Sequence, residues 1–236
     1  MKTLRTVALI GFVLLLSGLS ACKDDDTPSG PQEVSGVIEL TDPGSHQIMI
    51  DADEVKASVL IVGAGGGGGG GVVYENVTNS TGGGGGGGAG ESIFIASSDL
   101  KGGVTYTINI AAGGQGGVPG NDGQKPGLTT IDLGQVALHA AKAGNGGRSN
   151  SKGESVGGAA GSGFPGGAKG TDGEMSDNSW SADAGKGGLG GDNQSGQGSG
   201  GTGGNGASLK NKVPTDATNG GKGGNGYVKI EWTGVK

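Results

Sequence analysis

The chain has 236 residues, of which 61 are glycine, while 31% are hydrophobic and 3% are aromatic. This composition excludes an ordinary hydrophobic core running through the whole chain, so the chain is either largely disordered or ordered by backbone hydrogen bonds. The formal net charge is -6 and the lysines are scattered. That distribution argues against a nucleic-acid-binding protein, because no basic stripe could neutralise phosphates.

The N-terminus has the pattern of a secretion leader. Lys2 and Arg5 precede an apolar run over residues 7–16, which is too short to cross a membrane as a helix of about 20 residues. We therefore predict a signal peptide over residues 1–21. The residues that close it resemble the bacterial lipobox: Leu19, Ser20, Ala21 and Cys22.

The lipobox resemblance implies cleavage before Cys22 and attachment of diacylglycerol and palmitate chains to that residue. The alternative is an ordinary signal peptide beside a small buried cysteine. Cys22 is the only cysteine, so no disulfide can form within the chain. Because each buried acyl CH₂ contributes about 0.8 kcal/mol, several chains on one residue would anchor the protein stably to a membrane.

Residues 22–35 contain "KDDDTPSGPQE" and cannot bury apolar area, which predicts a flexible acidic tether. Its first charged residues resemble the lipoprotein export signal of Bacteroidota: Lys23, Asp24, Asp25 and Asp26. This resemblance implies display on the outer face of the outer membrane. A plain solvated linker is the alternative, with the lipoprotein facing the periplasm.

Beyond the tether, short runs rich in β-branched residues alternate with turn sequences. We expect strands over residues 35–40, 46–50, 57–62, 91–96, 104–111, 128–133, 135–141 and 226–232. None of the remaining sequence has a convincing helical period. The prediction is an all-β fold with almost no α-helix, in which the strands form a small sandwich-like region within a glycine-rich domain over residues 36–236.

The stretch "VLIVGAGGGGGGG" over residues 59–71 imitates a dinucleotide-binding loop. Such a site requires a helix after the glycines, since the pyrophosphate sits on that helix N-terminus. Glycine costs about 1 kcal/mol per helical residue relative to alanine, so the runs at 65–71 and 82–88 exclude this helix. We therefore expect no nucleotide cofactor.

The glycine runs can instead order one another. Fixing the backbone costs roughly 1 to 2 kcal/mol per residue and a hydrogen bond returns about 0.5 to 1.5 kcal/mol, so a lone run stays disordered. Several runs side by side as extended polyglycine II helices would bond to neighbours in several directions. Non-glycine residues should then recur at multiples of three on outward edges. Glycines spaced by three include Gly114, Gly117, Gly120 and Gly123; Gly158 and Gly161; Gly167, Gly170 and Gly173; Gly185, Gly188 and Gly191; Gly200, Gly203 and Gly206; and Gly220, Gly223 and Gly226.

Several motifs in this order resemble the glycine-rich domain of bacterial surface proteins and phage tail proteins. They are "ASVLIVGAGGGGGGG", a second glycine run, "LKGGVTYTINIAAGGQGG", "GLTTIDLG" and the closing "GGNGYVKIEW". The resemblance covers residues 35–232. It implies packed polyglycine II helices beside a small β-structure, with recognition on the loops that join the helices, as in phage tail-tip adhesins.

The residues that could carry chemistry are few. His46 and His139 lie on apolar runs without a partner at ligand spacing, which favours strand histidines over metal ligands. "GGLGGDNQS" over residues 187–195 matches a calcium-binding repeat only in part and occurs once. We expect no metal site and no enzyme. An enzymatic alternative would depend on His139 or a nearby Asp.

We therefore predict a non-catalytic binding or adhesion module with an extracellular glycan or protein ligand. The best contact candidates lie in the loop "EMSDNSWSAD": Trp180, Asp177 and Asn178. A tryptophan in a polar loop offers a large contact area at low entropy cost. The alternatives are that Trp180 only caps an edge of the glycine array, and that the protein is a self-associating surface-layer component.

Overall fold

The computed structural model describes residues 30–74, 80–151, 155–167, 181–210 and 213–236. The predicted leader, Cys22 and the export signal lie outside the described residues, as do Asp177, Asn178 and Trp180. Residues Pro31–Lys236 form one compact unit. The described residues contain strands but no helix, so the all-β prediction is confirmed.

All eight predicted strands are present. Their bounds are β1 (Glu33–Leu40), β2 (Gly44–Met49), β3 (Asp53–Val62), β4 (Ser92–Ser98), β5 (Thr105–Ile110), β6 (Thr129–Leu133), β7 (Val136–Ala141) and β11 (Tyr227–Val235). Three two-residue strands were not predicted: β8 (Ser181–Ala182), β9 (Leu209–Lys210) and β10 (Val213–Pro214). These pairs are too short to leave a periodic pattern in the sequence.

The predicted tether over residues 22–35 is wrong at its C-terminal end, and the domain starts before residue 36. Strand β1 begins at Glu33, which pairs with Val235 of β11. Val34 is partly buried and packs against the core. The apolar side chain and a full ladder of strand hydrogen bonds therefore order a segment whose flanking Pro and Glu suggested a linker.

The strands form three antiparallel sheets, ordered β1-β11-β3-β4, β2-β5-β6-β7 and β10-β9-β8. In the two four-stranded sheets, alternate side chains point toward a single cluster of buried residues. This core contains Val59, Ile61, Val228 and Ile230 from the first sheet and Tyr106, Ile108, Ile110 and Ile131 from the second. The period-two alternation in "TYTINI" and "YVKIEW" therefore marks the face of each strand that is removed from water.

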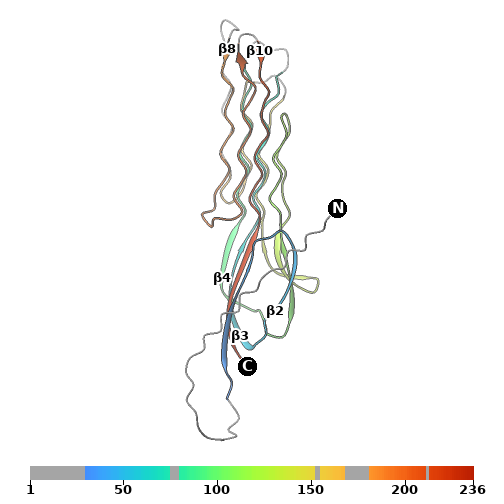
Figure 1. Cartoon of the computed structure of the whole chain (residues 1–236), viewed down its shortest axis with the longest axis vertical. Helices are drawn as coiled ribbons and strands as arrows, with labels where there is room; N and C mark the ends of the chain where they lie inside the picture. The colour runs from blue at the N-terminus through green and yellow to red at the C-terminus, as the bar shows by residue number, and fades with distance from the viewer. Residues whose placement is uncertain (1–29, 75–79, 152–154, 168–180, 211–212) are drawn as a thin grey trace, which may run out of the picture. The chain divides into compact units, whose positions relative to one another are not determined.

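Six of the strands continue directly into glycine-rich segments. Residues 63–73 follow β3 and residues 80–91 precede β4. The other four are residues 111–118 after β5, 120–128 before β6, 142–149 after β7 and 218–226 before β11. Figure 1 shows these segments side by side within the unit Pro31–Lys236, with β8 and β10 at the end away from β3 and β4.

Residues 63–73, which we call the central segment, donate hydrogen bonds with a period of three. The N–H groups of Gly65 and Gly68 donate to Gly224 and Gly221 of one antiparallel neighbour. Gly66 and Gly69 donate to residues 80–91, and Gly67 and Gly70 donate to residues 120–128. These bonds are Gly66 to Gly88, Gly69 to Gly85, Gly67 to Gln124 and Gly70 to Asn121, all with N–O distances of 2.9 to 3.0 Å.

The carbonyl groups of the central segment accept from three further neighbours. Gly65 and Gly68 accept from residues 111–118, Gly66 and Gly69 from residues 198–207, and Gly67 from residues 142–149. The donors are Gly114, Gly117, Gly201, Gly204 and Gly147. Residues 63–72 of the central segment are therefore buried, although most of them have no side chain.

The exclusion of side chains from this segment follows from how closely its neighbours approach. A Cβ atom added at Gly68 would overlap the carbonyl of Thr202, one at Gly69 that of Arg148, and one at Gly70 that of Val118. These obstacles belong to three different segments and are all backbone, so they cannot move aside as a flexible side chain would. Glycine is consequently the only residue that fits at these three positions.

Side chains on the peripheral segments point outward with the expected spacing. In residues 183–192, Gly185, Gly188 and Gly191 are buried. The positions two residues before each of these glycines, and the one after the last, are exposed: Asp183, Lys186, Leu189 and Asp192. Glycines at every third position therefore face the interior, while the intervening positions are available for side chains.

Candidate functional site

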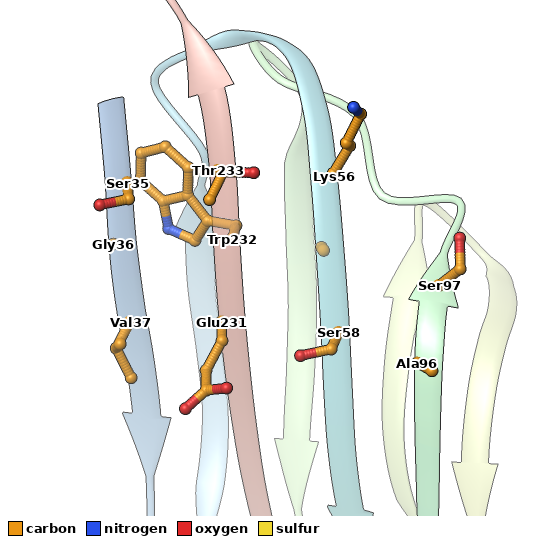
Figure 2. A pocket seen from close by; sticks show the side chains of 11 residues that line it. Ser35, Gly36, Val37, Lys56, Ser58, Ala96, Ser97, Glu231, Trp232 and Thr233 are labelled. Atoms are coloured by element: carbon orange, nitrogen blue, oxygen red, sulfur yellow. The ribbon is translucent and has the colours of Figure 1, made fainter. Parts of the chain in front are cut away.

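A shallow hollow of about 550 Å³ lies on the sheet β1-β11-β3-β4. Figure 2 shows that its floor is formed by neighbouring strands and that serine and alanine side chains lie among the larger Trp232, Glu231 and Lys56. The lining residues are Ser35, Gly36, Val37, Lys56, Ala57, Ser58, Ala96, Ser97, Glu231, Trp232 and Thr233. The small serine and alanine side chains are what leave this part of the sheet hollow.

Trp232 lines this hollow and also packs against the core. It lies opposite Gly36 in the pairing of β11 with β1. A Cβ atom added at Gly36 would lie 2.7 Å from Cζ2 of the Trp232 indole. The absence of a side chain at Gly36 therefore leaves room for the indole, and Trp232 stabilises the floor of the hollow.

The same sheet carries a short chain of polar contacts. The Tyr227 hydroxyl donates to Oε1 of Glu39 at 2.9 Å, and Lys229 pairs with Glu231 at 2.6 Å. Burial, followed by the hydrogen bond and charge of Glu39, raises the pKa of Tyr227 to about 12. The phenol is therefore held in its neutral form at any physiological pH.

We expect the Tyr227 phenol to ionise near pH 12 instead of near pH 10. Its proton is held more tightly in the folded state, so the folded protein should lose stability as the pH rises above about 10. The tyrosinate absorbance of the chain, minus that of Tyr227→Phe, measures this midpoint. Glu39→Gln should lower it part of the way toward the ordinary value, and an unchanged midpoint in that variant would contradict the contribution assigned to Glu39.

A second depression runs along the glycine segments as two adjoining hollows of about 500 and 280 Å³. They share Lys125, Asn145 and Ser162, so we treat them as one groove. The side chains come from three neighbouring segments at positions three apart. One flank carries Asp122, Lys125 and Leu128, the floor Lys142, Asn145 and Arg148, and the other flank Ala159 and Ser162, followed by Phe164.

Backbone and side-chain hydrogen bonds align these three rows. The Arg148 N–H donates to Ala159 and the Asn145 N–H donates to Ser162. The Asn145 amide also donates to the Ser162 hydroxyl at 2.6 Å. On the other side, the Ser149 N–H donates to the Asp122 carboxylate at 2.8 Å. The groove therefore has three successive rungs, each made of one residue from each row, which differ in charge and polarity. They are Asp122, Arg148 and Ala159; Lys125, Asn145 and Ser162; and Leu128, Lys142 and Phe164.

The two histidines are occupied within the strand region. Nε2 of His46 donates to the Asp42 carbonyl at 2.8 Å. His139 lies 2.9 Å from the Ser98 hydroxyl, and burial lowers its pKa while the nearby Asp99 opposes that shift. Neither histidine nor Ser98 lines the hollow of Figure 2 or the groove. The Ser98–His139 contact therefore lies outside both the hollow and the groove.

Within the described parts of the chain, no three His, Cys, Asp or Glu side chains come together as metal ligands. The partial calcium-like sequence forms a turn, in which the Gln194 N–H donates to the Asp192 carboxylate at 2.9 Å. Likewise, no helix long and apolar enough to cross a bilayer is found in the described ranges.

The groove was not predicted from the sequence. Its signal was present, because Asp122, Lys125 and Leu128 are spaced by three, as are Lys142, Asn145 and Arg148. The sequence does not show how these rows pair, because they come from separate segments.

Comparison of the chain with protein-family models and with curated proteins finds no match to either.

Proposed function

We propose that this chain is an outer-membrane surface lipoprotein whose glycine-rich domain is a non-catalytic binding or adhesion module. The observation that carries this proposal is the buried central segment, whose backbone groups bond to neighbours on all sides, while the row over residues 183–192 carries exposed side chains at every third position. Such an interior makes a rigid support, so ligand recognition would take place on the surface side chains and the loops.

The proposed scaffold is a bundle of polyglycine II helices joined to a small β-sandwich. The period of three in both donors and acceptors supports the three-fold helix, which has three residues per turn and no internal hydrogen bonds. The shared core of the two four-stranded sheets supports the sandwich. Both features agree with the glycine-rich domain family that the sequence resembles.

The proposed anchor is a lipid on Cys22. The charged residues that follow it would direct the protein to the outer face of the outer membrane. The support is the sequence pattern of residues 1–26. Cys22→Ser should release the protein from the membrane fraction, because one or more acyl chains would no longer hold it there. Retention of this variant in the membrane would overturn the lipid anchor.

The binding role and the surface-layer alternative differ in self-association. Leu189 is 71% exposed on the outer row of residues 183–192, which favours some contact between copies. We propose the binding role because most outward positions in that row are charged. Sedimentation of the full chain with Cys22→Ser should show a monomer over a wide concentration range. Concentration-dependent assembly would instead establish the structural alternative.

The proposed recognition loop is tested separately. Probing glycan and protein arrays with the same variant should identify a ligand, and Trp180→Ala should then weaken its binding. Unchanged binding would move the contact surface away from Trp180, Asp177 and Asn178 without removing the scaffold.

We expect the amides of residues 65–71 and 82–88 to exchange slowly with solvent, since each is buried and most donate to a neighbouring segment. Mass-spectrometric hydrogen exchange of the full chain with Cys22→Ser measures this protection. The exposed turn around Gly134 serves as the internal reference for fast exchange. Equally fast exchange in the glycine runs would refute the polyglycine II scaffold.

A further inference from the structure

We propose that the groove between residues 120–128, 142–149 and 156–164 binds an acidic polysaccharide, a linear polymer of uronic acids with its carboxylates facing Lys125, Lys142 and Arg148. The proposal rests on the binding function argued above and names the ligand class and a site for it. It assigns this site to residues other than the loop that contains Trp180 in the sequence.

The charge of the groove is opposite to that of the chain. Three cationic side chains line it against one carboxylate, Asp122, whereas the whole chain has a net charge of -6. Lys125, Lys142 and Arg148 are exposed, and no ion pair involves them among the described residues. The Glu91 carboxylate accepts from the Lys142 backbone N–H and does not line either hollow.

The spacing of these cations selects among anionic polymers. Positions three apart in an extended three-fold segment are about 9 Å apart, so Lys142 and Arg148 lie about 19 Å apart, with Lys125 across from the residues between them. Duplex DNA carries one charge per about 1.7 Å, which three such cations would neutralise poorly. A uronic acid polymer carries sparser charge, and alternate sugars in an extended chain are spaced by a length comparable to one rung.

The uncharged groups in the groove suit a sugar polymer as well. The Asn145 amide and the Ser162 hydroxyl lie at the middle rung, where sugar hydroxyls could exchange hydrogen bonds with them. At the end rung, Phe164 is 43% exposed and Leu128 is 54% exposed, on either side of Lys142. An exposed aromatic ring beside a cation provides an apolar surface for a sugar face next to a site for its carboxylate.

The test uses the full chain with Cys22→Ser and a 1,4-linked oligogalacturonate as the probe, with binding measured by calorimetry at low and high salt. The wild-type groove should bind the oligomer, and binding should weaken with salt because these charges are exposed. The methyl-esterified oligomer has the same backbone without the charges and should bind at least tenfold more weakly. A single-stranded oligonucleotide is the competing polyanion.

Lys142→Gln, Arg148→Gln and Lys125→Gln should each weaken binding by about two- to fivefold, as expected for exposed ion pairs, and more in combination. Lys222→Gln is the matched control, because Lys222 is exposed on residues 218–226 and lines neither hollow. Thermal unfolding checks that each variant is folded.

The inference is overturned if the oligogalacturonate does not bind, if the esterified oligomer binds equally well, or if the groove variants match the control. Tighter binding of the oligonucleotide would also overturn it and assign the groove to a nucleic acid. An array ligand that still binds the triple groove variant would preserve the proposed binding function while removing the groove from it.

Discussion

Replacing Gly68 with alanine is expected to lower the free energy of unfolding by about 3 to 6 kcal/mol, or to prevent folding. The added Cβ would overlap the Thr202 carbonyl. To relieve the overlap the central segment must move, which breaks the bond from Gly68 to Gly221 or the one from Gly117 to Gly68. Chemical denaturation monitored by circular dichroism measures the loss.

Gly127→Ala is the matched control for this substitution. A Cβ atom at Gly127 meets nothing within 4 Å, and the backbone there is not left-handed. Removing a glycine at such a site stabilises by about 0.4 to 1 kcal/mol through the unfolded chain. If the two alanine variants were equally stable, the glycines of the central segment would not be required for close packing.

Thr81→Val is expected to cost about 2 to 4 kcal/mol, although it conserves the size and branching of the side chain. Thr81 is fully buried, and its hydroxyl donates to the Val72 carbonyl at 2.5 Å and accepts from the Ala207 N–H at 2.7 Å. Valine would leave both backbone groups without this partner and away from water. In a unit of this size, each kcal/mol corresponds to about 2 to 4 °C in the melting temperature.

Thr81→Ser separates the hydroxyl from the methyl group. It keeps both hydrogen bonds and removes one methyl, so we expect a loss of only about 1 kcal/mol. A serine variant as unstable as the valine variant would show that packing, and not hydrogen bonding, makes Thr81 necessary where the central segment meets residues 80–91 and 198–207.

Local patterns predicted the strands and the alternation of buried and exposed residues. "TYTINI" and "YVKIEW" each carry a period of two, which directly reflects the face that a strand buries. The outward rows were predictable for the same reason, because Gly185, Gly188 and Gly191 carry a period of three. In both cases a repeat in the sequence equals a repeat in the backbone.

The sequence was least informative where partners are distant or patterns are short. Glu33 was placed in the tether because its strand depends on pairing with Val235, far along the chain. The groove was missed because Lys125, Asn145 and Ser162 become neighbours only through bonds between separate segments. Trp180 was selected as an isolated tryptophan in a polar loop, and its role stays a prediction.

The central segment also determines when during biosynthesis the domain can be completed. Its hydrogen-bond partners include Gly201, Gly204, Gly221 and Gly224, which leave the ribosome long after Gly65–Gly71. Because such distant closures slow folding, the early glycine runs must wait as unstructured chain for the C-terminal ones. The export that we propose for this chain would benefit from this delay, since translocation could finish before any compact obstacle has assembled.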